Sequence, residues 1–294
     1  LCIVCCLSPG LHMYRMMAAA NCLTYLLLLL LPLLLQTCSG LYRSSSSRQP
    51  TAYQYQRQRY HKHIMASSSS PESSTAMTKD NVYNQTVTPD ETPILIKDKL
   101  AEFELALDDV GDKEKRCYLM AKEKGPDECN DVHKLIFLRC EVFDVDRAVA
   151  RFVKYWNTRV ALFGQDKAFL PLTIDGALKD DMESIEVDYL QVANKTDPDG
   201  RAILLFDFNK EGEDVSSESL LRVVWYQVHV ALRQESCQKR GVVVYVRSID
   251  RFMDWRPSLS KKIAAAGRGI LPIRFAGMHF IHPPSYLTLI CKFV

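Results

Sequence analysis

Three short apolar runs separated by helix-length segments constrain the fold of this chain most. The runs are Ala202 to Phe208, Val242 to Val246 and Met278 to Ile281, and each has the length of a strand. The segment from Ser216 or Ser217 to Leu232, the segment after Pro257 and the segment from Tyr286 to Phe293 have helical patterns. The Asp-Pro-Asp-Gly sequence at residues 197–200 predicts a turn before the first strand. Alternating strands and helices imply right-handed crossovers, so we predict an α/β fold with a largely parallel sheet. We expect the first strand to be covered on both faces, because it is almost continuously apolar.

The loops of this predicted sheet argue against a nucleotide-binding enzyme. The Gly-x-Gly sequence at residues 267–269 precedes a strand instead of following one, and neither a Walker-type Gly-Lys-Ser/Thr nor a Gly-x-Ser-x-Gly turn occurs. His229, His279 and His282 lie in apolar contexts without a suitably spaced Ser, Cys or carboxylate partner. We therefore expect core histidines, and we predict a protein that is not an enzyme and has no cofactor and no metal site.

A helical segment precedes the α/β region. Its clearest helix follows the capping residue Asp144, because apolar residues recur at intervals of three and four from Val145 to Val160. Order should begin near Pro93, and Gly111 and the Gly125-Pro126 pair should end helices. The earlier helices are expected at residues 94–107, 112–124 and 131–140.

Charge and cysteine usage narrow the functional class. The formal net charge is +2, and all 35 acidic residues lie beyond residue 71, so the folded part is mildly acidic. Such a balance disfavours nucleic acid as a partner, because phosphates must be neutralised by basic side chains. The ten cysteines show no paired spacing that would build a zinc site or a disulfide-dense scaffold, so we expect free thiols.

The N-terminal 40 residues are interpreted separately. The leucine-rich run from Leu23 to Leu35 fits the core of a signal peptide, a retained anchor or the first part of an organelle address. A fourth interpretation starts the protein at Met65 and leaves it cytosolic. Residues 41–91 are Ser-, Gln- and Thr-rich, which predicts a disordered linker. Cytoplasmic localisation peripheral to membranes is expected, with membrane-anchored, secretory or organellar routing left open.

Several short sequences resemble those of the CRAL-TRIO lipid-binding family, nearest to its tocopherol-transfer and retinaldehyde-binding branch. The stretch FLRCEVFDVDRA at residues 137–148 resembles the N-terminal helical module of that family, although Glu141 replaces a common basic residue. Arg222-Val223, Gly241, the segment KKIAA at residues 261–265 and Pro272-Ile273-Arg274 follow in family order. The resemblance implies a helical module at residues 92–165 and a lipid-binding domain at residues 166–294. By the same resemblance this domain lacks the family's C-terminal gate, through either a fragmentary sequence or genuine truncation.

In the family, the sheet forms the floor of a lipid pocket and helices form its walls. By this resemblance the ligand would contact Val224, Trp225, Val228, Val242, Val244, Val246, Ile263 and Met278, and strand parity adds Phe206 and Phe208. This apolar lining favours an isoprenoid, sterol-like or acyl ligand, because burying a charged head group without partners is unfavourable. Phospholipid stays a broader possibility. Ile273 stands where the phosphoinositide-transfer branch has Glu, so half of that head-group site is missing.

The resemblance also implies a membrane-facing basic patch. Its predicted residues are Lys261, Lys262, Arg268 and Arg274, the last of which matches a position that the tocopherol branch uses at phosphoinositide-bearing membranes. We therefore expect a protein that binds a hydrophobic lipid and transfers or presents it between membranes. The alternative is a membrane-recruiting interaction module with a vestigial pocket.

Overall fold

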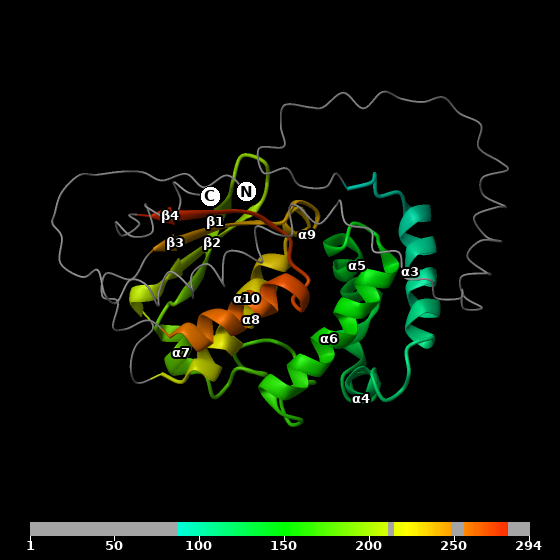
Figure 1. Ribbon diagram of the computed structural model, residues 1–294, viewed down its shortest axis with the longest axis horizontal. Coiled ribbons are helices and arrows are strands. Elements are labelled where there is room, and N and C mark those ends of the chain that lie inside the picture. Colours follow the sequence, from blue (N-terminus) through cyan, green and yellow to red (C-terminus); the bar gives the residue numbers. More distant parts are fainter. Residues whose placement is uncertain (1–87, 211–214, 248–255, 282–294) are drawn as a thin grey trace, which may run out of the picture.

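The computed structural model describes residues 88–210, 215–247 and 256–281 (Figure 1). The expected N-terminal apolar segment, the linker up to residue 87 and the expected helix from Tyr286 to Phe293 lie outside the described residues, as does His282. Within the three described ranges, no helix combines the length and the apolar character needed to cross a bilayer.

Four α-helices form the first part of the described chain. Thr92, Asn130 and Asp144 cap three of them, each accepting a hydrogen bond from the backbone N–H three residues later, which satisfies a free donor at the helix start. The sequence predicted the Asp144 cap correctly. The second helix starts at Arg116 and not at Asp112, because residues 112–115 form turns. The elements are α3 (Pro93–Asp108), α4 (Arg116–Lys124), the short 3₁₀ helix η2 (Pro126–Cys129), α5 (Asp131–Cys140) and α6 (Val145–Phe163).

The α/β part contains a four-stranded mixed sheet. Its strands lie in sequence order: β1 (Leu190–Thr196), β2 (Ala202–Asp207), β3 (Val242–Arg247) and β4 (Phe275–Ile281). β2, β3 and β4 pair in parallel, as the alternation of strands and helices predicted. β1 pairs antiparallel with β2 through the expected turn at residues 197–200, where Gly200 has a φ of 79°. The sequence did not predict β1, because its polar residues break the apolar pattern of a strand.

Short helices accompany the sheet. They are α7 (Met182–Glu186), η3 (Phe208–Lys210), α8 (Ser217–Leu232), α9 (Glu235–Arg240) and α10 (Pro257–Gly269). Ser216 caps α8, as expected, and α7, α8 and α10 lie on the same side of the sheet (Figure 1). A parallel strand order that advances in one direction with right-handed crossovers places its connecting helices on one face.

The two faces of β2 are unequally covered, which corrects the expectation that helices would bury both. Leu204 and Phe206 are buried, whereas Leu205 between them is 37% exposed. Successive side chains of a strand point to opposite faces, so Leu205 belongs to the less covered face. Tyr245 and His279 share that face in register with Leu205, and their rings stack at 4.8 Å between centroids.

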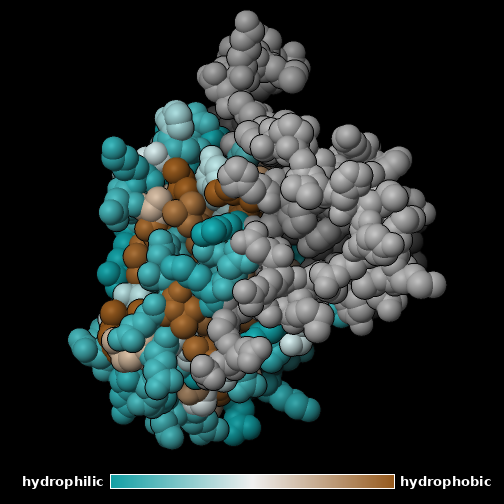
Figure 2. All heavy atoms as spheres, turned by 90° about the vertical axis from the view of Figure 1, so that its left-hand side faces the viewer, coloured by the Kyte–Doolittle hydropathy of each residue, from teal (hydrophilic) through white to brown (hydrophobic). Residues whose placement is uncertain are grey.

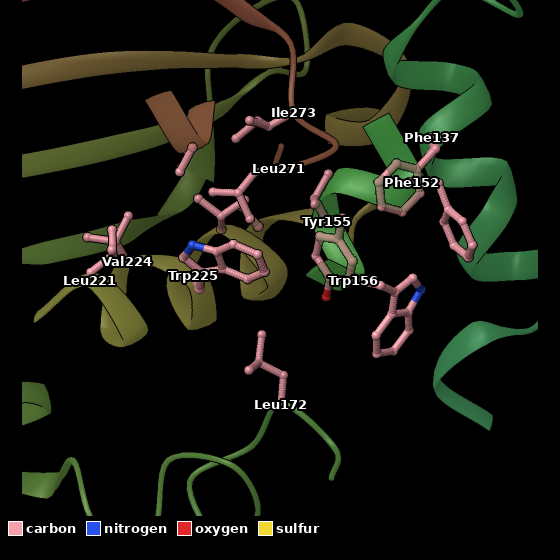
Figure 3. Packing of buried hydrophobic residues seen from close by; sticks show 14 of the residues in the cluster. Phe137, Phe152, Tyr155, Trp156, Leu172, Leu221, Val224, Trp225, Leu271 and Ile273 are labelled. Carbon is pink, nitrogen blue, oxygen red and sulfur yellow. The ribbon is translucent and has the colours of Figure 1, made fainter. Parts of the chain in front are cut away.

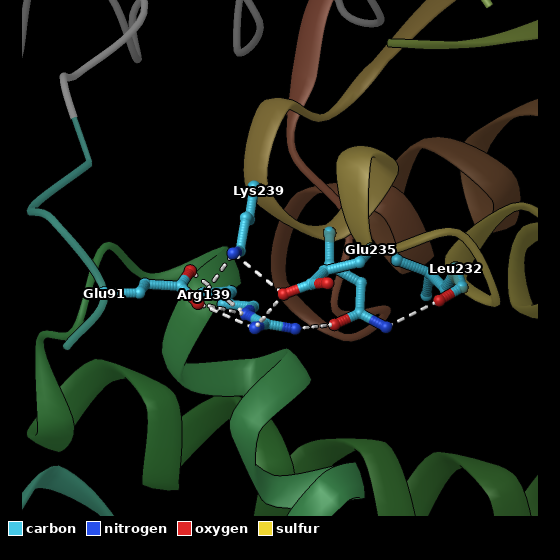
Figure 4. Close-up of polar contacts among 6 residues, drawn as sticks. Glu91, Arg139, Leu232, Glu235 and Lys239 are labelled. Atoms are coloured by element: carbon cyan, nitrogen blue, oxygen red, sulfur yellow. Dashed lines mark hydrogen bonds and ion pairs between the residues drawn. The ribbon is translucent and has the colours of Figure 1, made fainter. Parts of the chain in front are cut away.

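A polar cluster around Arg139 joins the helical part to the α/β part (Figure 4). The guanidinium of Arg139, at the end of α5, donates to both carboxylate oxygens of Glu91 and to Glu235 on α9. Gln238 accepts from the same guanidinium and donates to the carbonyl of Leu232. The side chains of Arg139 and Glu91 are only 8% and 7% exposed, so their pairing is shielded from water.

Candidate functional site

Five of the predicted ligand-lining residues come from the covered face of the sheet. Val244 pairs in register with Met278, and Val246 pairs with Phe206, so side chains from all three parallel strands meet on one face. Val242, Val244 and Val246 are at most 3% exposed, whereas Met278 on the edge strand β4 is half-buried. The β-branched valines suit this pleated, enclosed surface.

Helix α8 supplies the next three residues and faces the sheet. Val224 and Val228 lie four residues apart and therefore share one side of the helix, and Trp225 lies beside them. All three are buried, with exposures of 2%, 3% and 0% respectively. The sequence identified this apolar face from its helical spacing.

The last two predicted lining residues lie at the margin of the same cluster. Ile263 on α10 and Phe208 are half-buried and pack against it. Phe208 was expected inside a strand, but β2 ends at Asp207 and Phe208 starts the turn η3, so strand parity does not apply to it. Its ring centroid is still 6.2 Å from that of Phe206.

All ten predicted residues therefore belong to or pack against one continuous apolar cluster. The cluster extends from the sheet and α8 into α6 through a stack of Trp225 and Tyr155, whose ring centroids are 5.0 Å apart (Figure 3). Leu271 and Ile273, which precede β4, lie between Trp225 and the sheet in the same view. These residues pack closely, since most of the sheet and α8 members are almost completely buried.

The predicted basic patch is divided between α10 and the loop that follows it. Lys261 and Lys262 are exposed on α10, and Arg268 near the end of that helix is half-buried. Arg274 donates to the carbonyl of Lys239 at 2.9 Å, and burial lowers the pKa of its guanidinium. Arg274 is thus partly engaged within the fold, whereas the two lysines are the exposed members of the patch.

Glu141 and Arg151 hold the end of α10 in place. Arg151 on α6 donates to the carbonyls of Leu271 at 2.8 Å and Arg268 at 2.9 Å. Its guanidinium also donates to the buried carboxylate of Glu141, which pairs with Arg147 as well. Glu141 replaces the basic residue common in the resembled family, and here it neutralises an arginine beneath α10.

A buried hydrogen-bonded chain lies beneath Trp225, and the sequence did not reveal it. Arg159 donates to the hydroxyl of Tyr155 at 3.0 Å, and that hydroxyl lies 2.9 Å from Nε2 of His229. The other ring nitrogen of His229 lies 2.7 Å from the carbonyl of Trp225. Burial lowers the pKa of His229 to about 4 and keeps its imidazole neutral. His229 is therefore a core histidine with satisfied nitrogens, as expected. The same expectation was wrong for His279, which is half-buried on β4 and stacks on Tyr245 at the less covered face of the sheet.

A cavity of about 550 Å³ lies outside the predicted site, where α3 meets the start of α5. Its walls come from α3 and from the start of α5: Pro93, Ile96, Lys97, Leu100, Ala101, Glu104 and Asp131. Nearby apolar side chains such as Ile94 and Val132 are 73% and 69% exposed. The predicted lining residues contribute nothing to this cavity.

Any assignment of this chain to a family rests on its short sequences that resemble the CRAL-TRIO family. The sequence matches no known protein-family model. In the part of the chain that the structure describes, no three His, Cys, Asp or Glu side chains gather closely enough to hold a metal ion.

Proposed function

We propose that this chain is a CRAL-TRIO-type module that binds one hydrophobic lipid between α8, α10 and the covered face of the sheet, and transfers or presents it at membranes. The main support is the convergence of the ten residues expected from the resemblance. They are spread over more than 70 positions of sequence, yet they lie in or against one apolar cluster. A mixed sheet with its crossover helices on one face also has the arrangement that such a pocket requires.

In this mechanism the lipid partitions from the bilayer into the protein, and no covalent bond forms or breaks. A lipid that moves from a bilayer into a dry protein interior keeps its apolar surface away from water, and each Å² of such surface removed from water is worth about 25 cal/mol. The lining offers no charged side chain, so a neutral lipid fits it better than a charged one.

The lipid enters where the cluster is least covered. Ile263 and Met278 are half-buried at its margin, and the side of the molecule that holds the outer ends of α7, α8 and α10 shows apolar patches between hydrophilic atoms (Figure 2). Because the interior side chains pack closely, α10 must move away from α8 to admit a ligand. Lys261 and Lys262 on the exposed side of α10 would then meet the lipid head groups.

A direct test compares how much lipid two variants of β3 carry. Both variants replace a buried valine by phenylalanine, but on opposite faces of the strand. Val243 and Val244 are both 1% exposed but point to opposite faces of the sheet. Val244→Phe should fill the proposed pocket and lower the amount of lipid extracted with the purified full chain. Val243→Phe should cost similar stability, since overpacking is destabilising on either face, yet leave lipid loading unchanged.

The second candidate is a membrane-recruiting module whose pocket is vestigial. The close packing favours it, because Val242 and Trp225 are 0% exposed and already fill the interior. Mass spectrometry of lipid extracted from the full chain separates the two functions. A stoichiometric bound lipid supports transfer, whereas vesicle binding without any bound lipid supports recruitment.

A further inference from the structure

The indole N–H of Trp225 is a buried hydrogen-bond donor that finds no acceptor among the residues the structure describes. Trp225 is 0% exposed, and no hydrogen-bond partner for its Nε1 lies in the described part of the chain. Most buried polar groups in folded proteins are paired, and an unpaired donor destabilises the fold. Such a group in a predicted binding region therefore needs an explanation.

The packing of the ring fixes the direction of this N–H. Tyr155 stacks on the indole at 5.0 Å between centroids and 29° between planes, and Phe163 meets it edge-on at 6.1 Å. His229 stacks on the ring as well and lies within hydrogen-bond distance of the backbone carbonyl of Trp225. Contacts with three rings hold the indole, so it cannot easily turn to find another acceptor.

The fixed ring presents its nitrogen to the proposed lipid site. In Figure 3 the nitrogen lies on the side of the indole turned away from Tyr155 and towards the sheet. Val224 and Leu271, labelled on that side, have hydrocarbon side chains and cannot accept a hydrogen bond. The neighbouring Val224 and Val228 are among the residues proposed to line the pocket.

We infer that Trp225 Nε1 donates a hydrogen bond to a neutral oxygen of the bound lipid, so that the ligand class is an alcohol, aldehyde, ketone or ester and not a pure hydrocarbon. This inference rests on the proposed lipid-binding function and names its ligand chemistry. One neutral donor satisfies one neutral acceptor. A buried ionised carboxylate or phosphate needs several donors or a cation, which this lining lacks.

Trp156 provides a matched control within the same chain. Its indole is also 0% exposed, and its Nε1 also has no acceptor among the described residues. It belongs to α6, however, where it stacks on Phe169, and its ring centroid lies 5.1 Å from the guanidinium carbon of Arg159. The two tryptophans share the same chemistry, but only Trp225 lies among the proposed lining residues.

The test uses two pairs of lipids that differ by one oxygen. The pairs are geranylgeraniol with its hydrocarbon counterpart, and cholesterol with the same skeleton lacking the hydroxyl. Binding to the full chain, its Trp225→Phe variant and its Trp156→Phe variant is measured by competition, and the indole N–H signals are followed by NMR. The two variants assign those signals and show whether each protein stays folded.

The wild-type chain should prefer the alcohol of at least one pair by about tenfold, equivalent to about 1.4 kcal/mol. Trp225→Phe should abolish this preference and Trp156→Phe should keep it, and only the Trp225 N–H signal should move downfield on binding. Equal affinity for alcohol and hydrocarbon in the wild type, or a preference that survives Trp225→Phe, overturns the inference while lipid binding stands. If none of the four lipids binds to the wild type, the proposed function falls and the inference falls with it.

Discussion

Replacing Arg139 by Met should destabilise the protein strongly, because it leaves a buried carboxylate without its main partner. The side chain of Glu91 is 7% exposed and accepts from Nε and a terminal nitrogen of Arg139 at 2.6 to 3.1 Å. Breaking a buried ion pair by removing one partner costs about 3–5 kcal/mol. Lys239 stays 3.2 Å from Glu91 and is 36% exposed, so it compensates in part. We therefore expect Arg139→Met to lower the free energy of unfolding by about 3 kcal/mol, the lower end of that range.

The assay is urea unfolding of the full chain followed by tryptophan fluorescence and circular dichroism. If the same variant is unfolded by heat, a loss of about 3 kcal/mol in the free energy of unfolding should lower its Tm by about 6–12 °C for a folded region of this size. Glu91→Gln should destabilise less, since a neutral amide is cheaper to bury than an unpaired charge. The double variant should lose at least about 1 kcal/mol less than the two single losses added together, because the side chains interact directly.

An exposed ion pair supplies the comparison. Lys99 and Glu102 are 2.8 Å apart but their side chains are 26% and 38% exposed, so Lys99→Met should change stability by less than about 1 kcal/mol. The reasoning is refuted if Arg139→Met costs no more than Lys99→Met. It is equally refuted if the losses from the Arg139 and Glu91 variants simply add.

Three further predictions concern single positions. Gly241→Ala should lower the free energy of unfolding measured in urea by about 2–4 kcal/mol, because the φ of Gly241 is 84° and a Cβ there would lie 2.4 Å from the carbonyl oxygen of Arg274. Gly111→Ala should be nearly neutral, since a Cβ there would meet no atom within 4 Å. His229 has a folded pKa of about 4 against about 6.5 unfolded, so the unfolded state binds more protons between these values and stability falls as pH drops from 6.5 to 4, by about 3 kcal/mol. His229→Gln should flatten this slope, and an unchanged slope contradicts the assignment. Burial raises the pKa of Cys140 to about 12, so iodoacetamide at pH 8 should alkylate it more than tenfold more slowly than the half-buried Cys117, as mass spectrometry can follow.

Local signals made much of the fold predictable. Asp144 and Ser216 cap helices where the sequence placed caps, because a short polar side chain before an apolar periodic stretch satisfies the free N–H groups there. The spacing of Val224 and Val228 identified the buried face of α8, since a helix repeats every 3.6 residues. The turn at residues 197–200 followed from its Asp-Pro-Asp-Gly sequence.

The candidate site was predictable only as a set of apolar residues. By the family resemblance, Val242, Val244 and Val246 were expected to face the ligand together, and the structure places them on one face of the sheet. The N–H of Trp225, which is unpaired among the described residues, and the contacts of His229 with Tyr155 could not be anticipated, because they depend on how α6 meets α8. The same is true of Arg274, whose bond to the Lys239 carbonyl removes it from the freely exposed basic surface.

By itself, the sequence determined where the longer helices and the three parallel strands form and which of their sides avoid water, because these properties depend on neighbours within a few residues. Only the tertiary structure decided that β1 joins the sheet, that one face of β2 stays partly exposed and that Arg139 pairs with Glu91, 48 positions away. Pairing across such distances is set by the packing of whole elements. No short stretch of sequence contains both partners of these contacts.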